Sequence, residues 1–147
     1  MSLGLSINID RRRLKRLPQS LKGTHKAVYG GFPASKTPHE VLMHAIWNYF
    51  GTSRGIPPRP FIDHAINRNQ RHYVKIIERS AKAILLGDAS LDEVLISLGL
   101  RMAKDIRTAI ILLKRPHNAP STIKQKGFDN PLIDSGEMAN STTYELI

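Results

Sequence analysis

The most regular pattern in the chain is a stripe of apolar residues that follows Ser90 and continues for six helical turns. Its members are Leu91, Val94, Leu95, Leu98, Met102, Ile106, Ala109, Ile110 and Leu113. This spacing puts them on one face of a long helix, which must be buried against another element. Ser90 and Glu93 have the spacing of a capping box, and Pro116 lies beyond the end of the helix. Gly99 falls on the stripe, where its missing side chain predicts the close approach of a second helix.

A second long helix is predicted from Asp63, as its N-cap, to about Leu86, with Gly87 ending it. Its apolar face consists of Ile66, Tyr73, Ile76, Ile77, Ala81 and Ile84. Its outer face carries a basic stripe of Arg68, Arg71, Lys75, Arg79 and Lys82, with only Glu78 beside it. A shorter helix over about 38–50 is predicted to begin at Thr37 as N-cap, with Pro38 in the first helical position and Glu40 completing the cap.

Three segments have the composition or alternation of β-strands: 5–9, 27–29 and the C-terminal 140–147. A basic helical turn over 11–16 is predicted between the first two. Together with the helices, these segments predict an α+β fold. We expect an antiparallel sheet of about four strands, with two long helices packed against it, in a single domain over residues 1–147.

Two segments rich in proline, glycine or polar residues are predicted to be loops. In the first, 51–60, the prolines fix the backbone, and Phe61 is expected to anchor the loop under the long helix. The second, 115–131, is polar and contains Gly127, so it is predicted to be a long mobile loop that becomes ordered on contact with a partner. We interpret these loops as the working parts of a non-catalytic protein.

The net charge of +10 is unevenly distributed. Residues 11–36 contain eight Lys or Arg and no acid, so the N-terminal segment 1–26 is strongly basic, whereas four acids oppose two lysines from Lys124 onward. This asymmetry favours a polyanionic neighbour or head-to-tail self-contact, and simple solubility explains it equally well. The Arg68–Lys82 stripe is a candidate DNA-facing surface, although no recognisable nucleic-acid-reading module accompanies it.

Several chemical functions lack support in the sequence. The chain has no cysteine, which excludes disulfides, a thiol nucleophile and thiolate-bound metals. It also lacks the phosphate-binding glycine motifs and the HExxH zinc motif, and His39 and His44 have the wrong spacing to share an ion on one helical face. Asp134 and His64 are the best candidates for acid–base roles, but Asp134 stands in a common turn sequence. We therefore predict no enzymatic activity, metal or cofactor.

The chain also lacks the features of a membrane or exported protein. Its longest apolar run toward the C-terminal half, 109–113, is far too short to span a bilayer, and the N-terminus does not have the pattern of a signal peptide. We expect it to stay in the cytoplasm, or to enter a particle assembled there.

Two sets of motifs together resemble a known family. The first is Ala45-Ile-Trp-Asn-Tyr-Phe-Gly-Thr52 followed by Ile56-Pro-Pro-Arg-Pro-Phe61. The second is Asn118-Ala-Pro-Ser-Thr122 with Lys126-Gly127, then Pro131-Leu-Ile-Asp-Ser-Gly136 and Asn140-Ser-Thr-Thr-Tyr-Glu145. Their order over residues 27–147 is similar to that of the tail-completion and head–tail-joining proteins of long-tailed bacteriophages and prophages, also called virion-morphogenesis proteins. The motif residues are Phe50, Gly51, Thr52, Pro57, Arg59, Pro60, Phe61, Pro131, Leu132, Ile133, Asp134, Ser135 and Gly136.

The resemblance implies a structural protein that completes or terminates the tail and joins it to the head, as an oligomeric ring. Its partners would be copies of itself, tail-tube proteins and head or neck proteins, and the Arg68–Lys82 stripe would contact DNA passing through the channel. The chain would reside in the host cytoplasm during assembly and then in the virion. Two positions depart from the family pattern: Tyr49 replaces an acid and Ala139 replaces an arginine, so an ionic contact between them is absent. The alternative is a basic DNA-binding accessory protein.

Overall fold

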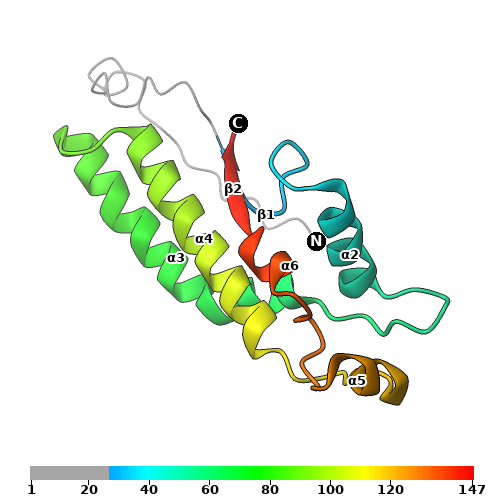
Figure 1. The fold of residues 1–147 in the computed structure, drawn as a ribbon. Helices are drawn as coiled ribbons and strands as arrows, with labels where there is room; N and C mark the ends of the chain where they lie inside the picture. The colour runs from blue at the N-terminus through cyan, green and yellow to red at the C-terminus, as the bar shows by residue number, and fades with distance from the viewer. Residues whose placement is uncertain (1–26) are drawn as a thin grey trace.

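The computed structural model describes residues 27–147, so the predicted strand at 5–9, the helical turn at 11–16 and the basic segment 1–26 lie outside the described residues. The elements in chain order are β1 (Val28–Gly31), α2 (His39–Phe50), α3 (Phe61–Leu86), α4 (Leu91–Leu112), α5 (Pro120–Lys126), α6 (Glu137–Asn140) and β2 (Thr143–Leu146). The fold is therefore α+β and mostly helical, as Figure 1 shows.

The sheet joins the two ends of the described chain. β1 and β2 run antiparallel, with Val28 opposite Leu146 and Gly31 opposite Thr143, and Ala27 and Ile147 extend the ladder through two backbone hydrogen bonds of 2.8 and 2.9 Å. The prediction that the C-terminal segment pairs into a sheet is confirmed. The predicted number of about four strands is wrong for residues 27–147, because the chain between these two strands forms helices and loops.

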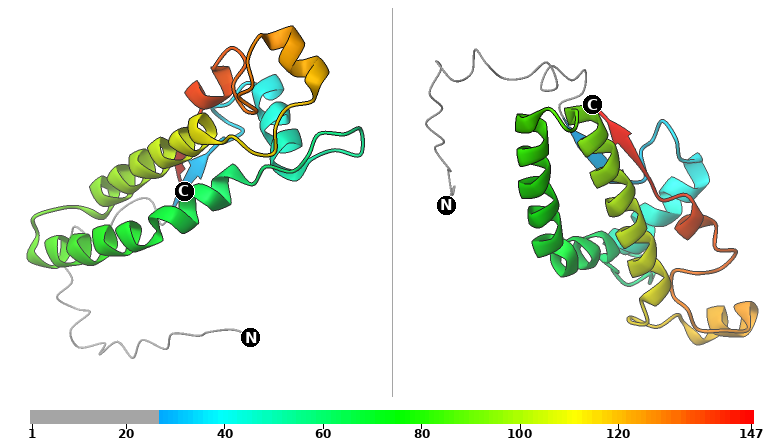
Figure 2. Two further views of the ribbon diagram at one scale, coloured as in Figure 1. Left: turned by 90° about the horizontal axis from the view of Figure 1, so that it is seen from below. Right: turned by 90° about the vertical axis from the view of Figure 1, so that its left-hand side faces the viewer.

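The two long helices lie in successive layers. α3 and α4 form a long antiparallel hairpin, and α4 packs both against α3 and against the two strands (Figure 2). The predicted pair of long helices beside the sheet is thus confirmed, and the contact with the strands comes mainly from α4. Within residues 27–147, no helix has the length and hydropathy needed to cross a membrane.

The ends of the helices test the predicted caps. The capping box of α4 is confirmed: the Glu93 N–H donates to Ser90 Oγ (3.2 Å), and the Ser90 N–H donates to Glu93 Oε2 (2.8 Å). Gly87 ends α3 in the left-handed conformation (φ 82°), also as predicted. The prediction for Asp63 is wrong, because α3 begins at Phe61 and places Asp63 in its first turn.

Thr37 is not the N-cap of α2. Pro38 holds that position without a side-chain hydrogen bond, and the Thr37 N–H donates to the Pro33 carbonyl (2.9 Å) to close a preceding turn. The Thr37 hydroxyl is buried and lacks a partner among the described residues. The predicted capping box therefore fails because Thr37 belongs to the turn before the helix.

Gly99 permits a close approach, as predicted, but the approaching element is the sheet and not a helix. A Cβ atom at position 99 would lie 2.6 Å from the ring atoms Cγ and Cδ2 of Tyr144 and 2.7 Å from Cγ2 of Val28. Gly30 on β1 makes the matching approach, since a Cβ there would lie 2.7 Å from Cβ of Met102. Two glycines, one on each surface, thus bring α4 against the strands.

Replacing Gly99 with alanine is expected to lower the free energy of unfolding by about 1–3 kcal/mol, because the added methyl group collides with Tyr144 and Val28. In an exposed helix the same change would raise stability by about 1 kcal/mol. Urea unfolding of Gly99→Ala measures the effect, with Ser97→Ala on the exposed side of α4 as control, expected within about 0.5 kcal/mol of the wild type. A more stable Gly99→Ala protein would contradict the close packing.

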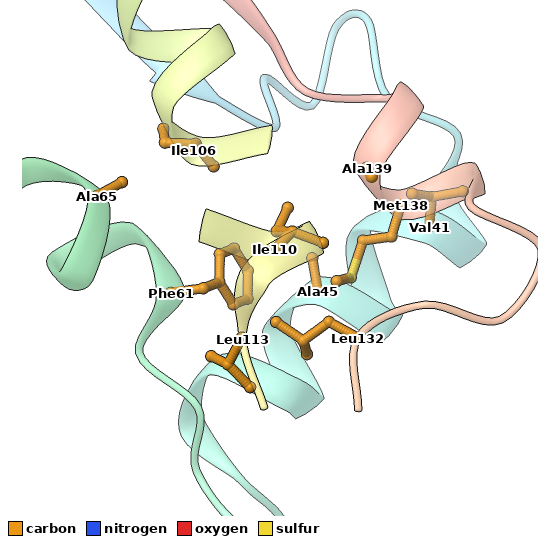
Figure 3. Packing of buried hydrophobic residues seen from close by; sticks show 10 residues of the cluster. All are labelled: Val41, Ala45, Phe61, Ala65, Ile106, Ile110, Leu113, Leu132, Met138 and Ala139. Carbon is orange, nitrogen blue, oxygen red and sulfur yellow. The ribbon is translucent and has the colours of Figure 1, made fainter. Parts of the chain in front are cut away.

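The core lies at one end of the α3–α4 hairpin, where α2, the start of α3, the C-terminal half of α4 and residues 132–139 meet (Figure 3). Phe61, Ile106 and Ile110 are fully buried there. Phe61 therefore anchors the end of the 51–60 loop in the core, but it is the first residue of α3 and does not lie under that helix as predicted. At the other end of the hairpin the predicted apolar face of α3 is only partly covered: Ile84 is buried, but Ile77 is 51% exposed.

Residues 115–131 are not a structureless loop, which corrects the sequence-based prediction. Residues 120–126 form helix α5, with Pro120 at its start and Gly127 ending it in the left-handed conformation (φ 80°). No residue of α5 is buried, and Figure 1 shows the helix projecting from the rest of the fold. The polar composition of this segment indicated exposure correctly, but not the short helix.

Candidate functional site

The first motif segment is a closed turn that only glycine can begin. Gly51 has φ 76°, and a Cβ there would lie 2.8 Å from the Ile56 carbonyl oxygen and 2.9 Å from the Pro58 nitrogen. Thr52 closes the turn: its N–H donates to the Ile56 carbonyl (2.9 Å), and its hydroxyl accepts from the Ile56 N–H (3.3 Å). The Phe50-Gly51-Thr52 motif thus shapes the backbone of the 51–60 loop.

Arg59 is the polar centre of this region and is only 3% exposed. Its Nη1 donates to Asn48 Oδ1 (2.7 Å), its Nε to the Pro116 carbonyl (3.0 Å) and its Nη2 to the His117 carbonyl (3.1 Å). Its backbone N–H donates to the Asn48 carbonyl (2.8 Å). One side chain therefore joins α2, the 51–60 loop and the segment after α4, which we call the Arg59 junction.

Burial and a nearby acid have opposite effects on the pKa of Arg59. Burial lowers the pKa of the Arg59 guanidinium, and the negative charge of Asp129 opposes this shift. Arginine remains charged under all ordinary conditions, so its donors stay available. Arg59 is a strong anchor between these segments, because a charged group donates each of its hydrogen bonds to a carbonyl or amide oxygen.

Asp129 fixes the base of the segment that contains α5. Its Oδ2 atom lies 2.5 Å from Nδ1 of His117, and its Oδ1 accepts from the Asn118 N–H (3.2 Å). The backbone N–H of Asn118 and the His117 side chain lower the pKa of the Asp129 carboxyl group. The Asn130 side chain then donates to the Ile111 carbonyl (3.2 Å). Residues 117–130 are thus closed at their base by Asp129, and Asn130 at the C-terminal end of the segment ties this base to α4.

The second motif segment, 131–136, combines a buried half with an exposed half. Pro131 and Leu132 are buried, and Leu132 joins the same core cluster as Phe61. Asp134 and Ser135 are exposed, and Gly136 adopts the left-handed conformation (φ 82°) immediately before α6. The two motif segments, far apart in sequence, therefore meet in one core.

A shallow hollow of about 210 Å³ lies between α2 and the second motif segment. Its lining includes His44 and Asn48 from α2, Lys126 from α5, and Asp134 and Ser135. His64, the other candidate for acid–base chemistry, lines a different hollow between α3 and α4. The structure thus does not bring Asp134 and His64 to one site. Among residues 27–147, no group of three His, Asp or Glu side chains is placed to hold a metal ion.

The basic stripe of α3 is confirmed as a solvent-exposed face. Its five members are all exposed and form no ion pair with a residue of 27–147: Arg68, Arg71, Lys75, Arg79 and Lys82. From first to last they span about 21 Å of helix, at about 1.5 Å for each residue. This face is therefore available to a polyanion.

An exposed apolar face on α2 was not predicted. Ile46 is 39% exposed, and beside it Trp47 is 41% and Phe50 72% exposed. Next to them, Leu42, Tyr49 and Ile62 line a third hollow, which is largely apolar and has a volume of about 240 Å³. We call Ile46, Trp47 and Phe50 the α2 apolar face. The spacing 46, 47 and 50 is visible in the sequence, but helical spacing alone does not tell which apolar face is buried.

The site is therefore a shaped surface around a buried arginine, bordered by an apolar face, in a mostly helical α+β protein. Comparisons with protein-family models, with curated proteins and with solved structures find no match for this chain.

Proposed function

We propose that this chain is a non-catalytic assembly protein of a phage or prophage virion, which completes or terminates the tail and joins it to the head as part of an oligomeric ring. The sequence resemblance to tail-completion and head–tail-joining proteins motivates the proposal. Its partners would be other copies of the chain, tail-tube proteins and head or neck proteins.

The observation that carries the proposal is the α2 apolar face. Large apolar side chains gathered on the surface of a protein mark sites of contact with other proteins. Trp47 and Phe50 are exposed aromatic residues, a type that is enriched in protein interfaces and among the residues that contribute most of the binding energy. Phe50 belongs to the first motif segment, so the motif contributes directly to this surface.

The motif geometry supports the same role. Gly51 and Thr52 hold the turn, Arg59 ties it to the segment after α4, and Phe61 and Leu132 anchor both segments in one core. These residues make a surface of fixed shape. A ring subunit requires such a surface, because each contact must repeat with the same geometry around a closed ring.

Deleting the gene from its phage or prophage is expected to give unjoined heads and tails, or tails of abnormal length, in electron micrographs. Wild-type protein should restore normal particles. A Trp47→Glu/Phe50→Glu variant should fail to restore them, because two charges would enter the apolar contact. Leu86→Glu is the control, since Leu86 is similarly exposed but lies at the far end of α3. Normal particles without the gene would contradict the proposal.

The alternative is a basic DNA-binding accessory protein, and the exposed stripe of α3 is the observation that favours it. This alternative predicts salt-dependent retention of DNA by the isolated chain. The assembly role predicts oligomers of the chain whether or not DNA is present.

A further inference from the structure

A second basic feature, not visible in the linear sequence, lies in the groove between α3 and α4. The groove has a volume of about 360 Å³. His64, Arg68 and Asn69 line it from α3, Thr108 lines it from α4, and Lys114 and Arg115 close it just beyond the end of α4. Three basic residues, Arg68, Lys114 and Arg115, thus line one groove from two segments about 45 residues apart in the sequence.

The acid in this groove does not neutralise these cations. Asp105, the only acid among the groove-lining residues, is 8% exposed. Its carboxylate accepts hydrogen bonds from Arg101 Nε (2.9 and 3.0 Å) and from the Tyr73 hydroxyl (2.9 Å). Asp105 is thus paired with Arg101. The side chains of Arg68, Lys114 and Arg115 form no hydrogen bond or ion pair with residues of 27–147.

We propose that the α3–α4 groove binds the phosphate groups of a double-stranded nucleic acid backbone. The groove is lined by arginine and lysine, the residues whose guanidinium and ammonium groups donate to phosphates in protein complexes. The neutral side chains of Asn69 and Thr108 already donate to carbonyls of their own helices, those of Ala65 and Lys104 (both 2.9 Å). Arg68 is also the first member of the α3 stripe, so the groove adjoins the stripe at this residue. A duplex, which carries phosphates at regular intervals, can occupy both parts, whereas a single phosphate occupies only the groove.

Lys114 and Arg115 also have a purely structural explanation. They follow Leu113, the C-cap residue of α4, and cations near the C-terminus of a helix stabilise the negative end of its dipole. That role predicts a change in stability when they are removed, and no particular change in binding to DNA. The structural explanation therefore predicts an effect on stability and the phosphate-binding explanation an effect on DNA affinity. One set of variants distinguishes the two.

The test compares two double variants that lose the same charge. Lys114→Ala/Arg115→Ala removes two groove cations, and Arg54→Ala/Lys124→Ala removes one cation from the 51–60 loop and one from α5. Binding of the full chain to a fluorescent DNA duplex is measured by anisotropy between about 50 and 200 mM salt, the range in which phosphate contacts weaken strongly. Inorganic phosphate and poly-glutamate serve as competitors, and thermal melting checks the fold of each variant.

The groove variant is expected to bind the duplex about tenfold or more weakly at low salt, with the slope of log affinity against log salt reduced by about 2. The control variant should lose clearly less. Equal losses of affinity in both variants would mean that binding depends on the overall charge and not on the groove, which would overturn the proposal. A wild-type chain that does not bind the duplex would also overturn it. Competition by poly-glutamate at equal charge would indicate an acidic protein partner, and competition by inorganic phosphate at low concentration would indicate a small phosphate ligand, so either would overturn it.

Phosphate binding in the groove rests on the nucleic-acid alternative and not on the assembly role, so the two can fail separately. Binding of DNA is measured on the isolated chain, whereas the assembly role is judged from particles in electron micrographs.

Discussion

Replacing Arg59 with alanine is expected to lower the free energy of unfolding by about 3–4 kcal/mol. The change removes three hydrogen bonds from a charged donor and leaves the Pro116 and His117 carbonyls and the Asn48 amide oxygen without that partner. Each hydrogen bond of a charged group contributes about 1.5–3 kcal/mol, and the three do not add fully because they share one side chain. Urea unfolding monitored by circular dichroism measures the loss.

The loss should also be local. Hydrogen exchange in Arg59→Ala is expected to accelerate first at the backbone amides near Asn118, because the segment after α4 is no longer held to the 51–60 loop. Arg59→Lys should recover only part of the stability, since one ammonium group cannot reproduce a planar guanidinium directed at three acceptors. Arg54→Ala in the same loop is the control. Arg54 is exposed, so its loss is expected to change stability by less than about 0.5 kcal/mol, and an equal effect at both arginines would contradict the Arg59 junction.

Replacing Phe61 with alanine is expected to cost about 3–5 kcal/mol. Phe61 is fully buried, and its ring meets those of Phe32 and Tyr49 edge-to-face at centroid distances of 6.1 and 5.6 Å. Removing it leaves a cavity between the start of α3, α2 and the second motif segment, which all meet in the core (Figure 3). Thermal or urea unfolding gives the magnitude.

Phe50 provides the matched control, because it is the same residue type in the same set of motifs but is 72% exposed. Phe50→Ala should change the stability of the isolated chain by less than about 0.5 kcal/mol, and its effect should appear in oligomer formation. Similar losses of stability for both substitutions would mean that the α2 apolar face is part of the core. The pair thus separates a residue that holds the fold from one that is available to a neighbour.

Because the comparisons with families, proteins and structures found no match, the particle-imaging experiment is the main test of the assembly role. The assembly role is supported by the order of the motifs and by the exposed aromatic residues that one of them contributes. The α3–α4 groove is independent of both, because it is defined by charge and geometry.

Local features of the fold were predictable from the sequence because the interactions that create them lie within a few residues. The capping box of Ser90 and Glu93 spans three positions, and the left-handed turn at Gly87 depends on one residue without a Cβ atom. The apolar stripe of α4 repeats every three to four residues, and this period alone indicated that Ile106 and Ile110 would be buried. The exposed basic stripe of α3 was predictable for the same reason.

Only the tertiary structure decided which faces meet. The sequence indicated that something approaches Gly99 closely, but the approaching residues, Tyr144 and Val28, lie 45 and 71 positions away, and they belong to the sheet. The sequence placed Arg59 among the motif residues, but it did not indicate the acceptors, Pro116 and His117, which lie nearly 60 positions further along the chain. Three further features could not be predicted for the same reason. They are the number of strands, the burial of Phe61 but not of Phe50, and the groove that Lys114 and Arg115 form with Arg68. Each depends on contacts between distant segments, which the spacing of residues along the chain does not specify.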